Sequence, residues 1–299
     1  MSEKIFRCGY CCIAGRPNVG KSTLLNRLCG EKIAIVTEKP QTTRHRMSAI
    51  KTTKDAQVIF LDTPGLHDSN KPLNKRMMKA ATGAAGDADV LLFMTETKCK
   101  NLDDELNWAK SLLRHKKPVI VAINKIDLVN KSSILPMIRQ WSDAGFDAIF
   151  PVSAKSGEGL DELERGIIER LPVGPALFPE DTLTEQNQRF LAAETIREKI
   201  FRFTQMEIPY STAVVVDEYK DRSEKLTAVR AVIYVEKDSQ KSIVIGQNGS
   251  MIKRIGTAAR IEMERRFGGK FFLDLNVKTR KDWTREEKFI KRLDERFGS

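Results

Sequence analysis

A phosphate-binding loop motif near the start of the chain is the first place where residue types and spacing could do chemistry. The motif has the pattern G-x-x-x-x-G-K-[ST], and its residues are Gly15, Arg16, Pro17, Asn18, Val19, Gly20, Lys21 and Ser22. In such a loop the backbone N–H groups surround phosphate oxygens, the lysine reaches the β- and γ-phosphates, and the final hydroxyl can ligate Mg²⁺. A glycine-rich turn before a helix would share the pattern. The apolar segment 10–14 and the helical pattern from Ser22 onward favour a nucleotide site, because the positive end of that helix faces the phosphates.

Three more motifs follow the loop in order along the chain. They are Asp62-Thr63-Pro64-Gly65, Asn124-Lys125-Ile126-Asp127 and Ser153-Ala154-Lys155. Asp62 ends an apolar segment, so its carboxylate can lie beside the metal with a water between them. Gly65 lacks a Cβ, so its backbone N–H can approach the γ-phosphate closely. The second motif therefore predicts contact with the γ-phosphate and its metal.

The third and fourth motifs predict the choice of base. A carboxylate at Asp127 can accept hydrogen bonds from the ring N–H and the exocyclic amine of guanine, a pair of donors that adenine lacks. Asn124 and Lys125 would brace the loop and cover the base, and the segment 153–155 would supply a backbone N–H to guanine O6. An Asn-Lys-x-Asp sequence alone could also cap a helix, but here it follows a strand-like segment in a chain that has a phosphate loop. Together the four motifs predict a guanine-nucleotide switch.

Alternating strand and helix patterns position these motifs. Strand-like segments lie at 10–14, 57–62, 90–95, 118–123 and 149–152, and helical patterns lie at 22–29, 73–85, 103–114, 132–143 and 159–170. Such alternation predicts βαβ units, and hence an α/β fold with a mostly parallel sheet covered by helices on both faces. Each motif comes where a strand ends, and ligands bind at the carboxyl edge of an open α/β sheet. We therefore expect a P-loop GTPase domain over residues 1–172.

A second domain is expected after residues 173–183, a segment rich in proline and glycine that is typical of a linker. Within residues 184–299, a helical pattern at 184–203 is followed by strands at 212–219 and 227–236, two helices joined by a loop, a strand at 271–277 and a basic helix near 284–296. The order αββααβ is that of an α+β type II KH fold, in which a G-x-x-G loop clamps four nucleotides of single-stranded RNA.

The loop between the two middle helices carries the predicted RNA site. Its residues are Gly246, Gln247, Asn248 and Gly249, and the basic Lys253, Arg254 and Arg260 follow. Glycines let RNA phosphates approach the backbone N–H groups without meeting a Cβ. The G-x-x-G pattern alone is weak, and a solvated basic helix would share these charges. The apolar segment 243–245 before the loop favours the RNA site.

Length, charge and cysteine content set limits on the class of protein. The 299 residues are enough for about two domains, and the hydrophobic content of 41% is enough for their cores. The formal net charge is +11, and the last 54 residues hold 14 basic and 8 acidic residues, which suggests a polyanionic partner. No stretch approaches the roughly 18–20 apolar residues of a membrane span, and the start of the chain lacks a secretory apolar segment. The five cysteines include one Cys-x-x-Cys pair, Cys8 and Cys11, but no second pair and no histidine cluster follow it. This favours reduced thiols of a cytosolic protein over a zinc site.

The four motifs resemble those of the translation-factor class of GTPases, and longer segments narrow the resemblance to the Era GTPases. Residues 40–44 resemble the first switch of that family. Residues 178–181, 188–190, 196–199 and 208–211 resemble the junction between its two domains and its second domain. The resemblance covers nearly the whole chain. It implies an enzyme that converts GTP to GDP and phosphate, binds the 3′ end of 16S rRNA and assists maturation of the 30S ribosomal subunit. It also implies a cytoplasmic protein with some peripheral association with the membrane.

Particular positions of the nucleotide site matter for mechanism. Leu66 stands where Ras-like enzymes place the glutamine that orients the attacking water, so we expect slow intrinsic hydrolysis. Asn18 resembles the asparagine with which relatives hold K⁺ near the phosphates, although it could serve only to shape the loop. For the first switch we choose Thr43 as the Mg²⁺ ligand beside Ser22, with Thr42 as the alternative. The expected nucleotide contacts are residues 15–22, 62–66, 124–127 and 153–155, and the expected catalytic residues are Lys21, Thr43, Asp62 and Gly65.

Two other functions fit parts of the sequence. One is an RNA-binding protein whose nucleotide domain no longer hydrolyses GTP. It is disfavoured by the intact nucleotide motifs, which retain Lys21, Ser22, Asp62 and Asp127. The other is a GTPase that acts in tRNA modification, which the KH-like ending disfavours. Both are alternatives to a ribosome-assembly GTPase at the level of the sequence.

Overall fold

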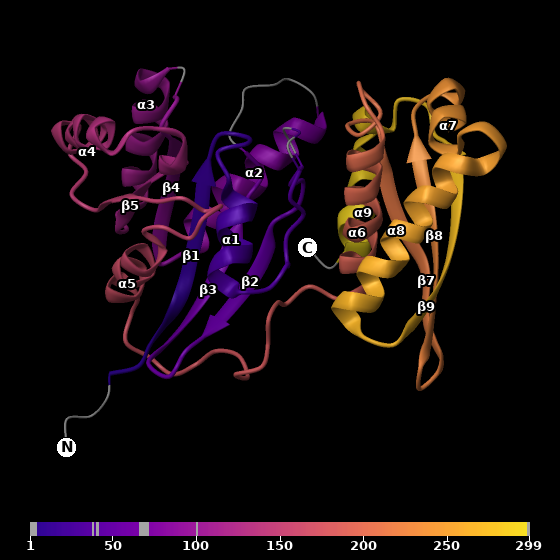
Figure 1. The fold of residues 1–299 in the computed structure, drawn as a ribbon, viewed down its shortest axis with the longest axis horizontal. Coiled ribbons are helices and arrows are strands. Elements are labelled where there is room, and N and C mark those ends of the chain that lie inside the picture. Colours follow the sequence, from indigo (N-terminus) through magenta and orange to yellow (C-terminus); the bar gives the residue numbers. More distant parts are fainter. Residues whose placement is uncertain (1–4, 38, 40–41, 66–71, 100, 298–299) are drawn as a thin grey trace. The chain divides into compact units, whose positions relative to one another are not determined.

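The chain divides into two compact units in a computed structural model that describes residues 5–37, 39, 42–65, 72–99 and 101–297. The first unit comprises Met1–Val36, Thr43–Ser69 and Arg76–Glu185, and the second comprises Thr37–Thr42, Asn70–Lys75 and Gln186–Ser299. Each unit contains a separate sheet (Figure 1).

Six strands form the sheet of the first unit, in the order β2-β3-β1-β4-β5-β6. They are β1 (Arg7–Gly15), β2 (Met47–Thr52), β3 (Ala56–Asp62), β4 (Val90–Glu96), β5 (Val119–Asn124) and β6 (Ile149–Pro151). All neighbouring strands pair in parallel except β2, which pairs antiparallel with β3. The five expected strands are confirmed, and β2 is an addition that the apolar pattern did not predict. The α/β class with a mostly parallel sheet is also confirmed.

Five helices cover this sheet. They are α1 (Lys21–Cys29), α2 (Pro72–Asp87), α3 (Leu102–Leu112), α4 (Ile134–Asp143) and α5 (Leu160–Arg170). One buried cluster joins Ala85 of α2, Leu112 of α3 and Trp141 of α4 to alternate residues of the strands, such as Phe93. The residues that point to the other face, such as Ile13, are equally buried, and α1 and α5 contact the strands there (Figure 1). Helices cover both faces of the sheet, which explains why the strand sequences are almost entirely apolar.

The second unit has the topology expected for a type II KH domain. Its elements are α6 (Gln188–Phe203), β7 (Ala213–Ser223), β8 (Leu226–Val235), α7 (Asp238–Ile245), α8 (Ser250–Phe267), β9 (Lys270–Thr279) and α9 (Glu287–Phe297). The sheet order is β7-β8-β9, with β7 antiparallel and β9 parallel to β8. Helices α6 and α8 pack on each other and on this sheet (Figure 1). The expected order αββααβ, followed by a basic helix, is confirmed.

Residues 171–185, which we call the strap, run along the first unit and are bonded to it at several points. Gln57 of β3 is fully buried, and its Oε1 accepts hydrogen bonds from the backbone N–H groups of Leu177 (2.8 Å) and Phe178 (2.9 Å). Further along, the Ile50 N–H donates to the Leu183 carbonyl at 2.9 Å, and Thr184 Oγ1 donates to the Ser48 carbonyl at 2.6 Å. The proline- and glycine-rich segment expected as a linker is thus fastened to β2 and β3.

The cysteines are free thiols. Cys8, Cys11 and Cys12 lie in the interior of β1, and burial raises the pKa of Cys12 to about 12 and that of Cys29 to about 12. Among the described residues, no cluster of three histidine, cysteine or acidic side chains could hold a metal ion. The helices in the described part of the chain are all too short or too polar to cross a membrane.

Candidate nucleotide and RNA sites

The phosphate loop connects β1 to α1 at the carboxyl edge of the first sheet. Lys21 is the first residue of α1, and its side chain is 6% exposed. Its Nζ donates hydrogen bonds to the carbonyls of Gly15 (3.0 Å) and Arg16 (2.9 Å) within the loop. Burial lowers the pKa of Lys21 to about 8 from an ordinary value of 10.5, although the nearby Asp62 carboxylate opposes this shift. A buried ammonium held in this way is suited to receive a strongly negative ligand.

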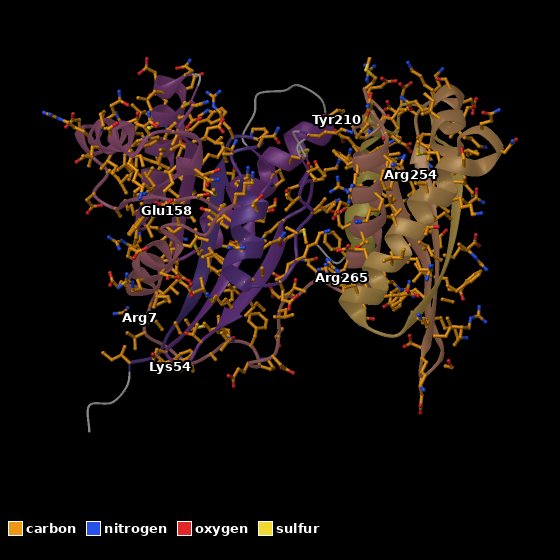
Figure 2. All side chains as sticks on the ribbon, viewed as in Figure 1. Arg7, Lys54, Glu158, Tyr210, Arg254 and Arg265 are labelled. Atoms are coloured by element: carbon orange, nitrogen blue, oxygen red, sulfur yellow. The ribbon has the colours of Figure 1, made fainter. Side chains whose placement is uncertain are left out.

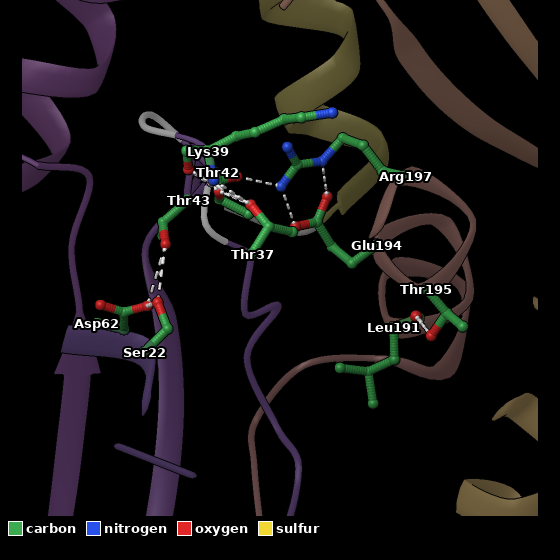
Figure 3. A network of polar contacts seen from close by, with 10 residues as sticks. All are labelled: Ser22, Thr37, Lys39, Thr42, Thr43, Asp62, Leu191, Glu194, Thr195 and Arg197. Atoms are coloured by element: carbon green, nitrogen blue, oxygen red, sulfur yellow. Dashed lines mark hydrogen bonds and ion pairs between the residues drawn. The ribbon is translucent and has the colours of Figure 1, made fainter. Parts of the chain in front are cut away.

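Three oxygen-bearing side chains meet next to this lysine (Figure 3). Ser22 Oγ donates to Asp62 Oδ2 at 2.7 Å, and Thr43 Oγ1 donates to the same oxygen at 3.2 Å. The two hydroxyls lie 3.2 Å apart. The other carboxylate oxygen, Asp62 Oδ1, is buried without a hydrogen-bond partner among the described residues, and burial raises the pKa of Asp62. An unpartnered buried oxygen beside two hydroxyls is the kind of donor set that suits a hard, hydrated cation.

The alternative ligand, Thr42, faces other groups. Its Oγ1 donates to the Lys39 carbonyl at 2.8 Å and lies 2.7 Å from Thr37 Oγ1. Within the second unit, which includes Thr37–Thr42, the Thr42 carbonyl accepts from Arg197 Nη2 at 2.5 Å (Figure 3). Arg197 is paired in turn with Glu194 of the same helix, α6. Of the two candidate threonines, the structure brings Thr43 to Ser22 and Asp62.

The second motif lies against the phosphate loop. A Cβ built on Gly65 would stand 2.7 Å from the Pro17 nitrogen and 2.8 Å from its Cα, so only glycine fits between the two loops. Thr63 is fully buried, and its Oγ1 donates to the Ile13 carbonyl of β1 at 2.8 Å. Leu66, the apolar residue after this motif, lies outside the described residues.

Asn124 joins the loops that we expect to hold the base and the phosphates. It ends β5 and is buried. Its Nδ2 donates to the Val19 carbonyl of the phosphate loop at 2.7 Å, and its Oδ1 accepts from the Ala154 N–H at 2.9 Å. One amide therefore fastens three of the four motifs to each other.

The base-binding candidates lie on the turns after β5 and β6, where Asp127 is exposed and Ser153 is buried. Ser153 Oγ donates to Asp127 Oδ1 at 2.7 Å, which orients the exposed Asp127 carboxylate. Lys125 has a left-handed backbone, with φ 65°, and its ammonium is paired with Glu96 at the end of β4. Sequence reasoning did not identify Glu96 as part of the site. Its place after the apolar residues of β4, level with Asn124 in the parallel pairing, is the signal that could have found it.

The G-x-x-G loop of the second unit joins α7 to α8. Gly246, Asn248 and Gly249 all have positive φ, at 74°, 51° and 74°. A Cβ on Gly246 would stand 2.7 Å from the Met251 nitrogen, whereas a Cβ on Gly249 would meet only Ile252, at 4.0 Å. The backbone at Gly249 is therefore open to an approaching group, and the exposed Gln247 and Asn248 stand beside it.

A groove of 290 Å³ lies between α8 and β9, next to this loop. It is lined by Ile252, Lys253, Gly256, Thr257, Arg260, Leu273 and Leu275. Apolar walls with two cations suit a nucleobase and its phosphate. Arg254 is not among the lining residues, because its guanidinium stacks on the Phe203 ring of α6 at 4.3 Å, and further basic residues such as Arg265 continue along α8 (Figure 2).

Comparison with known proteins gives the same two parts. The family described as "50S ribosome-binding GTPase" matches residues 10–125, and the family described as "KH domain" matches residues 207–284. GTPase Era of Geobacter metallireducens is 47% identical over 295 residues, which are 98% of this chain and 99% of that protein. GTPase Era of Coxiella burnetii is 44% identical over 290 residues, which are 96% of this chain and 97% of that protein.

Two solved structures agree over almost the whole length. A crystal structure of a variant of Aquifex aeolicus Era bound to GDP·AlF4⁻ has a TM-score of 0.92, 39% identity, and coverage of 98% of this chain and 99% of that one. A crystal structure of Era in complex with MgGDPNP and nucleotides 1506–1542 of 16S ribosomal RNA has a TM-score of 0.93, with the same identity and coverage. With this similarity along both units, and with the four nucleotide motifs at one sheet edge, the chain belongs to the Era family of GTPases.

Proposed function

We propose that this GTPase binds GTP and GDP with Mg²⁺ at the carboxyl edge of the first sheet, and that its second unit binds the 3′ end of 16S rRNA during maturation of the 30S subunit. The observation that carries the nucleotide part is the meeting of Ser22, Thr43 and Asp62 beside the buried Lys21. The relative bound to MgGDPNP supports it.

The residues present fit a magnesium ion. Ser22 and Thr43 would be direct ligands, and Asp62 Oδ1, which has no partner in the described part of the chain, would hold a coordinated water. Mg²⁺ bound there would neutralise charge on the β- and γ-phosphate oxygens. Ligation would use a lone pair of each hydroxyl oxygen, so Ser22 and Thr43 would still donate their protons to Asp62 Oδ2.

Lys21 and Gly65 act on the reacting phosphate. Lys21 would turn its ammonium to the β- and γ-phosphates, where negative charge is concentrated as the bond to the leaving group breaks. The Gly65 N–H, held against Pro17, would donate to the γ-phosphate. Leu66 offers no group that orients water, so we propose that intrinsic hydrolysis is slow.

Asn18 supports a finer proposal, a K⁺ ion beside the phosphates. Asn18 is exposed on the phosphate loop, with a φ of 63°. K⁺ there would add positive charge where Leu66 gives no help. The test is the hydrolysis rate in equal concentrations of K⁺ and Na⁺. We expect faster hydrolysis in K⁺ for the wild type and equal rates for Asn18→Ala. Equal hydrolysis rates of the wild type in K⁺ and in Na⁺ would contradict the K⁺ site.

The RNA part is supported by the groove and by the relative solved with 16S rRNA. Phosphates would approach the backbone at Gly249, and bases would enter the groove beside Lys253 and Arg260. The charge of residues 246–299 adds a salt-dependent contribution to affinity. We propose the role in 30S maturation because this RNA segment belongs to the small subunit.

We place the protein in the cytoplasm, with peripheral association with the membrane as a finer proposal that rests on the resemblance and on the net charge of +11. Sedimentation with vesicles that contain anionic phospholipid, compared with vesicles of zwitterionic phospholipid alone, tests this association. Absence of binding to both kinds of vesicle would contradict membrane association.

The nucleotide proposal is tested by phosphate release from GTP. Lys21→Ala should abolish measurable hydrolysis, because the ammonium acts where charge develops in the transition state. The control is Lys131→Ala, whose side chain is 88% exposed and is paired with Glu158 on the surface. Wild-type hydrolysis by a folded Lys21→Ala protein would overturn the assignment.

A further inference from the structure

The side chain of Arg16 leaves the phosphate loop and is held by one helix, α3. Its guanidinium carbon lies 5.0 Å from the centre of the Trp108 ring, and its Nη2 lies 3.1 Å from Asp104 Oδ2. Its Nε lies 3.3 Å from Glu105 Oε1. Positions 104 and 108 are one helical turn apart, so the arginine lies along one face of the helix, between a carboxylate and an aromatic ring.

The contact between Arg16 and Glu105 matters because the Glu105 side chain is buried, with only 2% of its surface exposed. Its other carboxylate oxygen accepts a hydrogen bond from Thr95 Oγ1 at the end of β4. Burial raises the pKa of the neighbouring Cys99 thiol to about 11, and the Glu105 charge adds to that shift. A buried carboxylate needs a cation close by, and Arg16 brings one from the phosphate loop.

The end of α3 that carries these residues is itself well fixed. Asn101 caps the helix by accepting from the Asp104 N–H at 3.3 Å, and three acidic residues in the first turn complement the helix dipole. Trp108 is partly buried against the main core of the first unit. Arg16 thus contacts a capped helix that packs against the core of the first unit.

The backbone of Arg16 meets the groups expected to act on phosphate. Its carbonyl accepts from Lys21 Nζ at 2.9 Å, and the next residue, Pro17, is the one that lies against Gly65. A lysine ammonium has three donors, so a carbonyl that takes one of them constrains the direction of the others. A shift of this peptide would move both Lys21 and Gly65.

We propose that Arg16 is a positioning residue for GTP hydrolysis, and that α3, through Trp108, Asp104 and Glu105, fixes the peptide that orients Lys21 and contacts Gly65. This inference rests on the proposed role of Lys21 at the phosphates. Arg16 does not touch the reacting atoms. Its side chain points to α3, and its effect reaches the phosphate through its own carbonyl.

The test compares kcat and KM for GTP in full-length Arg16→Ala, Glu105→Gln, the double variant and Lys21→Ala. We expect Arg16→Ala to lower kcat about tenfold or more, with a smaller change in KM, because misplacement of Lys21 weakens contacts made in the transition state. Arg16→Lys should recover part of the loss, because it keeps the charge but lacks the planar group that stacks on Trp108. The double variant should match Arg16→Ala within about twofold, because both changes break one connection.

Glu164→Gln is the matched control for Glu105→Gln. Glu164 is a half-buried carboxylate of the same unit, paired with Lys51 at 2.6 Å and placed outside the nucleotide site. We expect the control to keep wild-type kcat and KM. If Arg16→Ala does not fold, Glu105→Gln preserves the shape and the acceptor for Thr95 and carries the same test.

Two outcomes overturn the inference while Lys21→Ala is inactive. One is a folded Arg16→Ala protein with kcat within twofold of the wild type. The other is an equal effect of Glu105→Gln and Glu164→Gln. If Lys21→Ala hydrolyses GTP normally, the proposed phosphate site fails first, and the two failures are therefore distinguishable.

Discussion

Asn124 Nδ2 donates a hydrogen bond to the Val19 carbonyl at 2.7 Å, so the end of β5 is fastened to the phosphate loop. The same amide accepts from the Ala154 N–H at 2.9 Å. Neither backbone group can turn to water, because all three residues are buried. One buried side chain therefore holds the phosphate loop, the end of β5 and the segment after β6 together.

Asn124→Ala should weaken binding of GDP about tenfold and lower the thermal midpoint of unfolding. The substitution leaves a buried carbonyl and a buried N–H without partners, which costs about 1–3 kcal/mol for each group that finds no water. The exposed Asn130→Ala is the control and should leave both quantities unchanged. Similar losses in the two variants, measured by fluorescent-nucleotide titration, would contradict the role of Asn124.

Asp127→Asn should weaken the binding of GTP and strengthen the binding of xanthosine triphosphate. The carboxylate is expected to accept from two guanine donors, and the loss of hydrogen bonds to a charged group costs about 1.5–3 kcal/mol. Ser153→Ala is an informative companion, because it removes the donor that orients Asp127 Oδ1 at 2.7 Å. It should weaken GTP without favouring the xanthine base. Equal affinity of the wild type for ATP and GTP would contradict the assignment.

Binding of GDP in EDTA should take up protons near pH 8. The pKa of Lys21 is about 8 in the nucleotide-free protein, so the ammonium loses its proton above this pH, and phosphate charge should raise that pKa again. We expect an uptake of about half a proton per site at pH 8 and below about a tenth at pH 6.5. Calorimetry in buffers with different ionisation enthalpies measures it. Lys21→Met should show no uptake, and equal uptake at both pH values in the wild type would disprove the origin in Lys21.

Gly249→Asp should abolish tight RNA binding while GTP hydrolysis without RNA is unchanged. The new carboxylate would stand where an RNA phosphate approaches the loop. Gly268→Asp is the matched control, because both glycines have a φ of 74° and Gly268 has open space around it at the end of α8. The ψ angles differ, at 13° for Gly249 and 175° for Gly268, so the control carries the greater backbone strain. Retained RNA binding by Gly268→Asp would therefore assign the loss in Gly249→Asp to the position of the charge.

Anisotropy titration with single-stranded RNA that matches the 3′ end of 16S rRNA, at two salt concentrations, measures this effect. Affinity of the wild type should fall steeply with salt, because Lys253 and its neighbours release counterions from the RNA. Gly246→Asp is a poorer test, because a Cβ there would stand 2.7 Å from the Met251 nitrogen and disturb the loop itself. An unchanged dissociation constant for folded Gly249→Asp would place the RNA site elsewhere.

The sequence carried enough information for the architecture, because strands buried on both faces are continuous apolar runs. It did not reveal β2, whose residues Met47–Thr52 mix polar and apolar types and gain their strand structure by pairing with β3. It also placed the start of α6 too early. Thr184 is bonded to the Ser48 carbonyl, and the Asn187 side chain caps the helix by accepting from the Phe190 N–H at 2.8 Å.

Pairings between distant segments were the part of the site that spacing could not supply. The contacts of Lys125 with Glu96 and of Arg16 with Glu105 join residues that are 29 and 89 positions apart, and no local pattern marks them. The choice between Thr42 and Thr43 was open for the same reason. The two adjacent hydroxyls differ by only one position in their spacing from the phosphate loop, and only the folded backbone turns one of them toward Ser22.

The hydrogen bonds of the strap shorten the part of the chain that could act as a free linker. While it is bonded to β2 and β3, the Glu185 N–H donates to Ser48 Oγ, and the cap of α6 at Asn187 follows two residues later. If the strap detached from Pro172 onward, the tether would lengthen to about 15 residues with a root-mean-square span of roughly 20 Å. Gln57 and Ser48, far in sequence from either ligand site, therefore keep this segment from behaving as a free linker.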